Sequence, residues 1–181
     1  MTPFFTVGHS DRSLDAFIDL ILGAGIVHVA DIRKMPMSRA NPQFNRDVLA
    51  EALPRHGIGY EHVASLGGLR GRDRRVPFAV NALWQNRSFH NYADYALSPE
   101  FRAGLDHVLG QGDGARLTVM CSEAVWWRWH RRIVAEYLVA RGREVFHIMG
   151  EGRLDPALLT PGGIVMTDAS ITYPAKDEGA P

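Results

Sequence analysis

Cysteine is almost absent from this 181-residue chain, which contains only Cys121. A single thiol excludes an internal disulfide and any metal site built from several thiolates. The chain also has no run near the ~18 uninterrupted apolar residues of a membrane span. Its first residues, MTPFFTVGHSDRS, contain neither a basic region nor a long apolar run, so we expect no signal peptide. These absences predict a soluble, cytoplasmic protein without a membrane partner.

The chain has no excess of either charge, because 20 Lys and Arg residues balance 20 Asp and Glu residues. This balance excludes a global field that recruits nucleic acid or an anionic membrane, although it leaves room for a local basic patch. The length is sufficient for one sizeable hydrophobic core and too short for two domains that each have a core of that size. We predict a single domain over residues 1–168 and a polar, flexible tail over residues 169–181. Nothing in the sequence indicates the oligomeric state.

Strand-like and helix-like segments alternate along the chain. Short segments typical of strands lie at residues 4–7, 26–32, 58–63, 116–120 and 144–148. Helical patterns separate them: Ser13 and Asn45 can cap two helices, and a further helix is predicted to follow Cys121 and to run through Val139. This order predicts an α/β fold, namely a mostly parallel sheet of about five strands with helices on both faces.

Polar side chains gather where the predicted strands end. They are His9 and Ser10 after the first strand, Asp31 and Arg33 after the second, Glu61 and His62 after the third, and Cys121 and Glu123 after the fourth. In open parallel sheets, ligands bind beyond the carboxyl ends of the strands. The sequence therefore predicts a binding or active site at that edge of the sheet.

The densest chemistry lies in the stretch VMCSEAVWWRWHRR, residues 119–132. Cys121 is either a nucleophile or metal ligand, activated by a helix N-terminus, or a small buried hydrophobe. It does not belong to a phosphatase loop, because the sixth residue after it is Trp127 instead of arginine. His130 is either a group facing the site or a satisfied core histidine. Arg131 either reaches the site or forms a structural salt bridge with Asp31 or Glu123.

Other features indicate an anionic ligand. The turn Gly8-His9-Ser10 can hold an anion on its backbone N–H groups, and Arg33 and Arg39 supply guanidinium groups nearby. At least one of Trp126, Trp127 and Trp129 is expected to flank the cleft or to be exposed. Such a tryptophan can stack on a base or a sugar, and the alternative is that the tryptophans only pack against the protein. A long loop over residues 65–89 carries a basic run that is either solvated or guides a polyanion: Arg70, Arg72, Arg74 and Arg75.

Several blocks of the sequence occur in the order of one known family. These are TVGHSDRSLDAFIDLI, DIRKMPMSRANPQFN, GIGYEHVASLGG, FHNYADYA and MCSEAVWWRWHRR. The chain resembles the family catalogued as Domain of Unknown Function 488 from about residue 5 to residue 148. The resemblance implies an α/β domain without an assigned activity. Its signature positions here include Ser38, Tyr60, Tyr92 and Tyr95, besides those already named.

One departure from the family pattern concerns the second cysteine that commonly precedes the histidine of the last block. In this chain Trp129 precedes His130, so neither a disulfide nor a two-thiolate metal site can form within the chain. If this protein shares an activity with its relatives, that second cysteine is dispensable for it.

Three hypotheses follow. The first is an enzyme for an anionic, phosphate- or nucleotide-like small molecule, in which catalysis rests with Asp31, Cys121, Glu123 and His130, and binding with His9, Ser10, Arg33, Ser38, Arg39, Tyr92, Tyr95 and Arg131. The second is a nucleic-acid-binding module that uses the basic loop and a tryptophan. The third is a non-catalytic sensor or partner-binding domain with a structural charge network. A divalent metal is compatible with these residue types, but the sequence does not require one.

Overall fold

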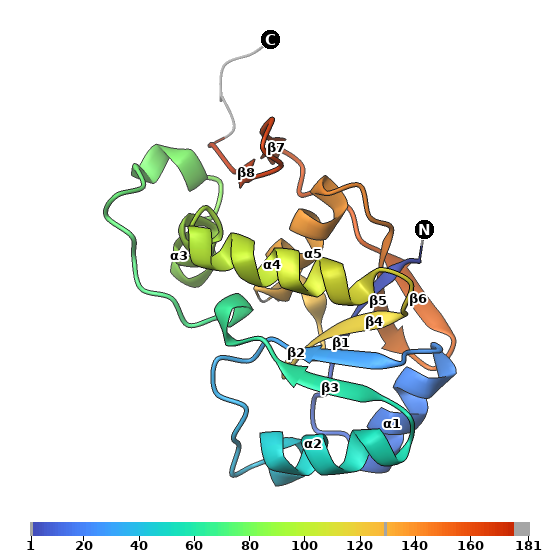
Figure 1. Cartoon of the computed structure of the whole chain (residues 1–181). Coiled ribbons are helices and arrows are strands. Elements are labelled where there is room, and N and C mark those ends of the chain that lie inside the picture. The colour runs from blue at the N-terminus through green and yellow to red at the C-terminus, as the bar shows by residue number, and fades with distance from the viewer. Residues whose placement is uncertain (1, 129, 176–181) are drawn as a thin grey trace.

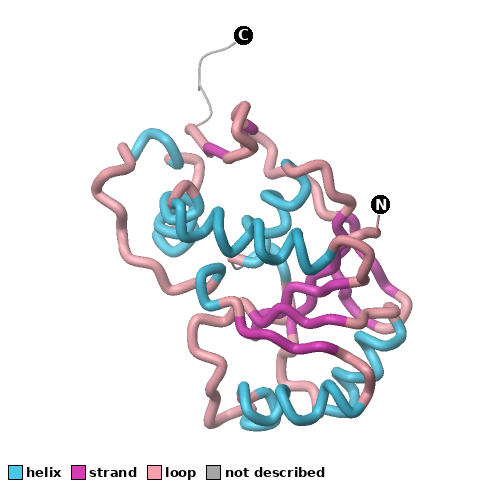
Figure 2. The backbone as a smooth tube through the Cα atoms, viewed as in Figure 1, coloured by secondary structure: helices cyan, strands magenta, loops and turns pink. Residues whose placement is uncertain are grey.

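A computed structural model describes residues 2–128 and 130–175. Its centre is a six-stranded sheet in the order β3-β2-β4-β1-β5-β6, in which the first five strands are parallel and β6 is antiparallel (Figures 1 and 2). The strands are β1 Phe4–Gly8, β2 His28–Asp31, β3 Gly59–His62, β4 Leu117–Cys121, β5 Val145–Gly150 and β6 Arg153–Pro156. The predicted α/β fold is confirmed, with one more strand than the sequence indicated.

Helices cover both faces of this sheet, as predicted. In Figure 1, one group of helices lies below the strands and another lies above them. The lower pair is α1 Leu14–Gly23 and α2 Arg46–Arg55, and the upper group is α3 Arg87–Ala96, α4 Pro99–Gly112 and α5 Arg131–Ala140. Each face therefore has its own apolar core, and the sheet separates the two.

Local sequence explains most of these elements. The hydroxyl of Ser13 accepts a hydrogen bond from the backbone N–H of Ala16 (3.2 Å) and so caps α1. Phe17 and Ile21 then fall on the face of α1 that packs on the sheet. The strands β1 and β4 are buried along their whole length, as expected for the centre of a parallel sheet.

The segment after β4 differs from the prediction. A helix was expected directly after Cys121, but α5 begins only at Arg131, and the intervening chain contains a short 3₁₀ turn at Trp126–Arg128. The residues between β4 and α5 therefore form a loop at the carboxyl end of the sheet. The predicted long loop is shorter than expected, since α3 begins at Arg87, and it contains two further 3₁₀ turns at Ala64–Leu66 and Phe78–Asn81.

The tail prediction is wrong for residues 169–175. This segment contains β8 Ile171–Thr172, which pairs with β7 Ile164–Val165. Ile171 and Tyr173 are fully buried, and the Tyr173 hydroxyl donates to the Glu136 carboxylate (3.0 Å). The prediction rested on the polar composition of the tail, but the buried side chains of Ile171 and Tyr173 anchor residues 169–175 to the domain. Residues 176–181 lie outside the described residues.

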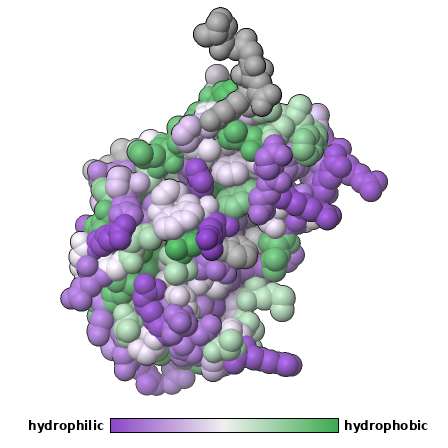
Figure 3. Space-filling model, turned by 180° about the vertical axis from the view of Figure 1, so that it is seen from behind, coloured by the Kyte–Doolittle hydropathy of each residue, from purple (hydrophilic) through white to green (hydrophobic). Residues whose placement is uncertain are grey.

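The surface mixes polar and apolar side chains. Seen from behind, hydrophilic and hydrophobic side chains are interspersed across the molecule (Figure 3). Within residues 2–128 and 130–175, no helix is both long and apolar enough to cross a membrane.

Candidate functional site

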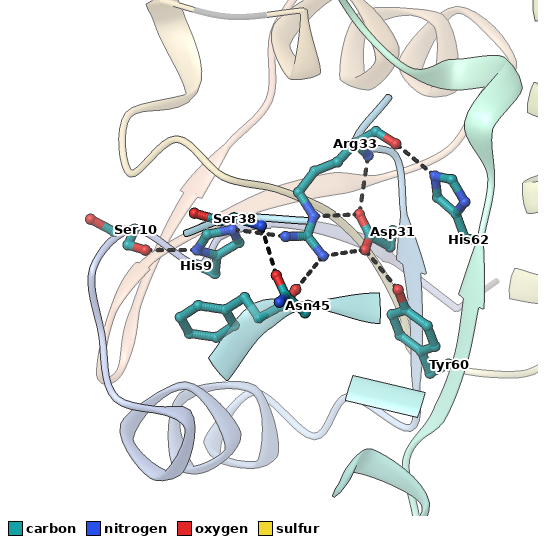
Figure 4. Close-up of polar contacts among 9 residues, drawn as sticks. His9, Ser10, Asp31, Arg33, Ser38, Asn45, Tyr60 and His62 are labelled. Carbon is teal, nitrogen blue, oxygen red and sulfur yellow. Dashed lines mark hydrogen bonds and ion pairs between the residues drawn. The ribbon is translucent and has the colours of Figure 1, made fainter. Parts of the chain in front are cut away.

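Asp31 and Arg33 form a buried ion pair at the carboxyl end of β2 (Figure 4). The Arg33 Nε donates to Asp31 Oδ1 (2.9 Å) and Nη2 donates to Oδ2 (2.6 Å), while the backbone N–H of Arg33 donates to Oδ1 (3.0 Å). Arg33 Nη2 also donates to the Phe44 carbonyl (2.7 Å). Such bidentate contact fixes the guanidinium group in one orientation. Asp31 is thus engaged in holding Arg33, which leaves it poorly suited to the acid–base role expected of it.

Tyr60 and His62, both on β3, complete this arrangement. The Tyr60 hydroxyl donates to Asp31 Oδ2 (2.8 Å), and the His62 Nε2 donates to the carbonyl of Arg33 (2.7 Å). Burial, together with the Asp31 carboxylate, raises the pKa of Tyr60, so the tyrosine remains a donor at physiological pH. Two neighbouring strands thereby hold one arginine side chain and its backbone in place.

His9 lies on the other side of the Arg33 guanidinium (Figure 4). Its Nδ1 is 2.7 Å from the Ser10 carbonyl, which can only accept, so Nδ1 carries the proton and Nε2 accepts from Arg33 Nη1 (3.3 Å). The ring stacks on Phe44 at 4.1 Å between centroids. Burial lowers the pKa of His9 to about 4, and the positive charge of Arg33 contributes to that decrease. The imidazole is therefore neutral at physiological pH.

The predicted anion-binding turn after β1 does not have free N–H groups. The backbone N–H of His9 donates to Cys121 O (3.0 Å), and that of Ser10 donates to Ser122 O (2.9 Å). The Ser10 hydroxyl donates to Asp11, and its backbone adopts a positive φ of 54°. The two backbone N–H groups on which the prediction of an anion site rested are therefore already used by the neighbouring strand end.

A cleft of about 1190 Å³ opens beside Arg33, at the carboxyl ends of the central strands. Four chain segments contribute most of its walls: the loop after β2, the glycine-rich turn around Gly68, the first turns of α3, and the loop after β4. Of the predicted site residues, the cleft is lined by His9, Arg33, Ser38, Tyr92, Glu123 and His130. The residues lining the described part of the cleft do not include the other six, namely Ser10, Asp31, Arg39, Tyr95, Cys121 and Arg131.

His130 forms part of the cleft wall at the start of α5. Its ring lies 5.0 Å from the ring of Tyr92, and a Cβ at Gly68 would come within 2.7 Å of its Nδ1. Burial lowers the pKa of His130 to about 4, and no described residue forms a hydrogen bond with its Nε2. The Tyr92 hydroxyl already donates to the Leu66 carbonyl (2.6 Å), so Tyr92 offers the cleft its ring.

Cys121 does not have the environment of an activated thiol. It lies at the end of β4 with a relative exposure of 1%, and nine residues separate it from Arg131, the first residue of α5. Burial raises the pKa of its thiol, and the nearby charge of Arg131 offsets this effect only in part. The expected stabilisation of a thiolate by a helix N-terminus is absent, because no helix begins there.

Arg131 is fully buried beneath the loop after β4. Its Nη2 donates to the Ala124 carbonyl (3.3 Å), whereas Nε and Nη1 have no hydrogen-bond partner among the described residues. Among the residues that the structure describes, neither Asp31 nor Glu123 forms an ion pair with Arg131. Burial lowers the pKa of Arg131. The predicted salt bridge with Asp31 or Glu123 thus does not form among the described residues, and Arg131 is not one of the residues that line the cleft.

The remaining predicted features divide between the cleft and the protein's own packing. Trp126 stacks on His147 at 4.3 Å, while Trp127 is 45% exposed and lines the cleft, as expected for one tryptophan. Trp129 lies outside the described residues.

In the basic loop, Arg70 lies over the Tyr95 ring and donates to Gly67 O (2.8 Å), and Arg75 pairs with Asp73. Two of the four arginines are thus already engaged within the loop region.

Sequence reasoning did not select several residues that line the cleft. They include Lys34, Met35, Met37, Leu69 and Arg128. Each of these five lies within two residues of a predicted position, so proximity in the chain was the available signal. Among the described residues there is no group of three or more His, Cys, Asp or Glu side chains arranged to hold a metal ion.

Comparison with known proteins assigns the chain to a family. A family model described as Domain of unknown function DUF488 matches residues 13–138, which is more than half of the chain. The chain belongs to the DUF488 family. The matched DUF488 region contains β2, β3 and β4 and every described cleft residue except His9. Neither a curated protein nor a solved structure matches the chain.

Proposed function

We propose that the cleft binds an anionic, phosphate-bearing small molecule. The observation that carries this proposal is the charge of the lining. The Arg33–Asp31 pair is neutral as a unit, and the other charged side chains that line the described cleft are three cations, Lys34, Arg70 and Arg128, against one carboxylate, Glu123. A concave surface with such an excess attracts anions and strengthens their binding.

The Arg33 guanidinium adds a directed contact to this field. Asp31 and the Phe44 carbonyl hold Nε and Nη2, Nη1 donates to His9 Nε2, and Arg33 is one of the residues that line the cleft. A guanidinium held in one orientation loses little conformational entropy when it binds an anion. The cleft therefore combines an oriented guanidinium with further cationic side chains in its lining.

Binding is supported more directly than catalysis. In an enzymatic version of the proposal, His130 and Glu123 are the cleft groups that would transfer protons. A pKa of about 4 makes the free His130 a weak base at neutral pH, whereas a general base works best with a pKa near that pH. A bound phosphate would raise this pKa, because its negative charge favours the protonated imidazole.

The two other hypotheses receive less support. An oligonucleotide module built on the basic loop loses the charge of Arg75 to its ion pair with Asp73, although the exposed Trp127 suits it. A purely structural charge network describes Asp31 and Arg33 well, but it leaves the large cationic cleft without a role.

Isothermal titration calorimetry with inorganic pyrophosphate, sugar phosphates and nucleotides tests the proposal. We expect at least one of them to bind, and Arg128→Ala to weaken that binding by about three- to tenfold, because one charge-assisted contact is lost. Arg39→Ala is the matched control: Arg39 is an exposed arginine outside the residues that line the cleft, so its loss should leave the affinity unchanged. Absence of binding by the whole panel, or equal effects of the two variants, would contradict the proposal.

A further inference from the structure

Large apolar side chains are exposed around the same cleft. Met35 is 71% exposed, Met37 63%, Leu69 77% and Trp127 45%, and all four line the cleft. Single exposed apolar residues are common on protein surfaces, but several that converge on one concavity mark a binding surface. These residues are therefore candidates for contact with an apolar part of the ligand.

The four side chains come from three segments that are far apart in the sequence. Met35 and Met37 follow β2, Leu69 belongs to the glycine-rich turn, and Trp127 lies in the loop after β4. The Lys34 Nζ donates to the Leu69 carbonyl (3.0 Å) and so ties the first two segments together. The apolar surface thus depends on the tertiary arrangement of the loops, not on one hydrophobic run.

The side chains of this surface favour a flat ring as the apolar part of the ligand. An indole ring offers a flat face for stacking, and thioether side chains adapt to the edges of aromatic rings. Arg33, Lys34 and Arg128 line the same cleft, so the surface presents a place for a flat ring beside a place for an anion. A nucleotide has both parts, whereas a sugar phosphate has only the anion.

We infer that the ligand of this cleft is a nucleotide, whose base lies against Trp127 and the apolar side chains of the rim. This inference rests on the proposed function, because it assigns the phosphate to the cationic lining. The cleft volume of about 1190 Å³ exceeds the roughly 300–1,000 Å³ usual for small-molecule sites, so the cleft has enough space for a mononucleotide. A single strand of nucleic acid is less favoured, because Asp73 neutralises Arg75 of the basic loop and the chain as a whole has no excess of positive charge.

Calorimetry with matched ligands separates the base from the phosphate. The ligands are the four ribonucleoside monophosphates, ribose 5-phosphate and a short single-stranded oligonucleotide. We expect at least one monophosphate to bind about tenfold more tightly than ribose 5-phosphate, since stacking one base on an aromatic side chain contributes this order of affinity. Trp127→Ala should remove that difference and leave the affinity for ribose 5-phosphate unchanged, while Trp127→Phe should restore part of it.

Leu158→Ala is the matched control, because Leu158 is 72% exposed and lies outside the residues that line the cleft. Equal affinity for ribose 5-phosphate and every monophosphate would overturn the base subsite while leaving the anion site intact. Failure of every ligand to bind would overturn the anion site itself. Binding of the oligonucleotide without binding of any monophosphate would also overturn the inference, in favour of a strand-binding surface.

Discussion

At the scale of single residues, Asp31 determines how the site is organised. Its two carboxylate oxygens receive hydrogen bonds from the Arg33 side chain and backbone and from the Tyr60 hydroxyl, and its side chain is completely buried. A buried arginine needs this compensation, because an unpaired charge in the interior is costly. In the proposed function, Asp31 would therefore act on the anion through Arg33, not by direct contact.

Replacing Asp31 should consequently cost much of the stability of the domain. We expect Asp31→Asn to lower the free energy of unfolding by about 3–5 kcal/mol, because it leaves Arg33 buried without a counter-charge. Urea denaturation measures this change. The matched control is Glu51→Gln, which removes the acid of an exposed arginine–carboxylate pair on α2 and should cost at most about 1 kcal/mol. Similar losses in both variants would contradict the role given to Asp31.

At the scale of elements, the site depends on how closely β1 approaches the loop after β4. A Cβ placed on Gly8 would lie 1.7 Å from the Glu123 carbonyl oxygen and 2.9 Å from Arg131 Nη1. Only glycine allows this packing, which sets the position of Glu123 on the cleft wall. The same loop carries Trp127, so the end of β1 supports the wall that is proposed to bind the base.

Gly8→Ala should therefore disturb both stability and ligand binding. The contact involves backbone atoms that cannot rotate away, so we expect a loss of about 3 kcal/mol in the free energy of unfolding. Gly23→Ala, at the end of α1, has no atom within 4 Å of the added Cβ and should be neutral or stabilising by up to about 1 kcal/mol. Thermal and urea denaturation of the two variants test this contrast, and equal stability of Gly8→Ala and the wild type would refute it.

At the scale of the whole molecule, buried histidines link stability to pH. Burial lowers the pKa of His9 and His130 to about 4 and that of His147 to about 3, below the ordinary histidine pKa of 6.5. The unfolded chain therefore binds more protons than the folded one between about pH 3 and 6.5. By linkage, the free energy of unfolding falls as the pH decreases through this window.

The pH dependence of the melting temperature tests this linkage. We expect the melting temperature to fall steadily as the pH decreases from 6.5 toward 4, because protonation favours the unfolded chain. His147→Gln should make that fall less steep, whereas His56→Gln serves as the control at an exposed histidine. A melting temperature that stays constant or rises between pH 6.5 and 4 would show that the buried histidines do not control acid stability.

The sequence by itself determined the α/β architecture, the family and the edge of the sheet at which the cleft opens. These properties follow from local patterns: apolar runs bounded by glycine, the cap at Ser13, and polar residues at strand ends. The helix expected after Cys121 was misplaced, because the composition of residues 122–130 does not show how the chain must turn away from the sheet. The buried anchors Ile171 and Tyr173 were missed because their burial depends on distant partners.

Only the tertiary structure decided which polar residues face the cleft and which satisfy one another. The prediction grouped Asp31, Cys121 and Arg131 with Glu123 and His130, because all lie near strand ends, but the first three are buried away from the cleft surface. Contacts such as Tyr60 to Asp31 join residues 29 positions apart. Their distances are set by strand pairing and loop packing across the whole domain, which the spacing of residues along one chain does not encode.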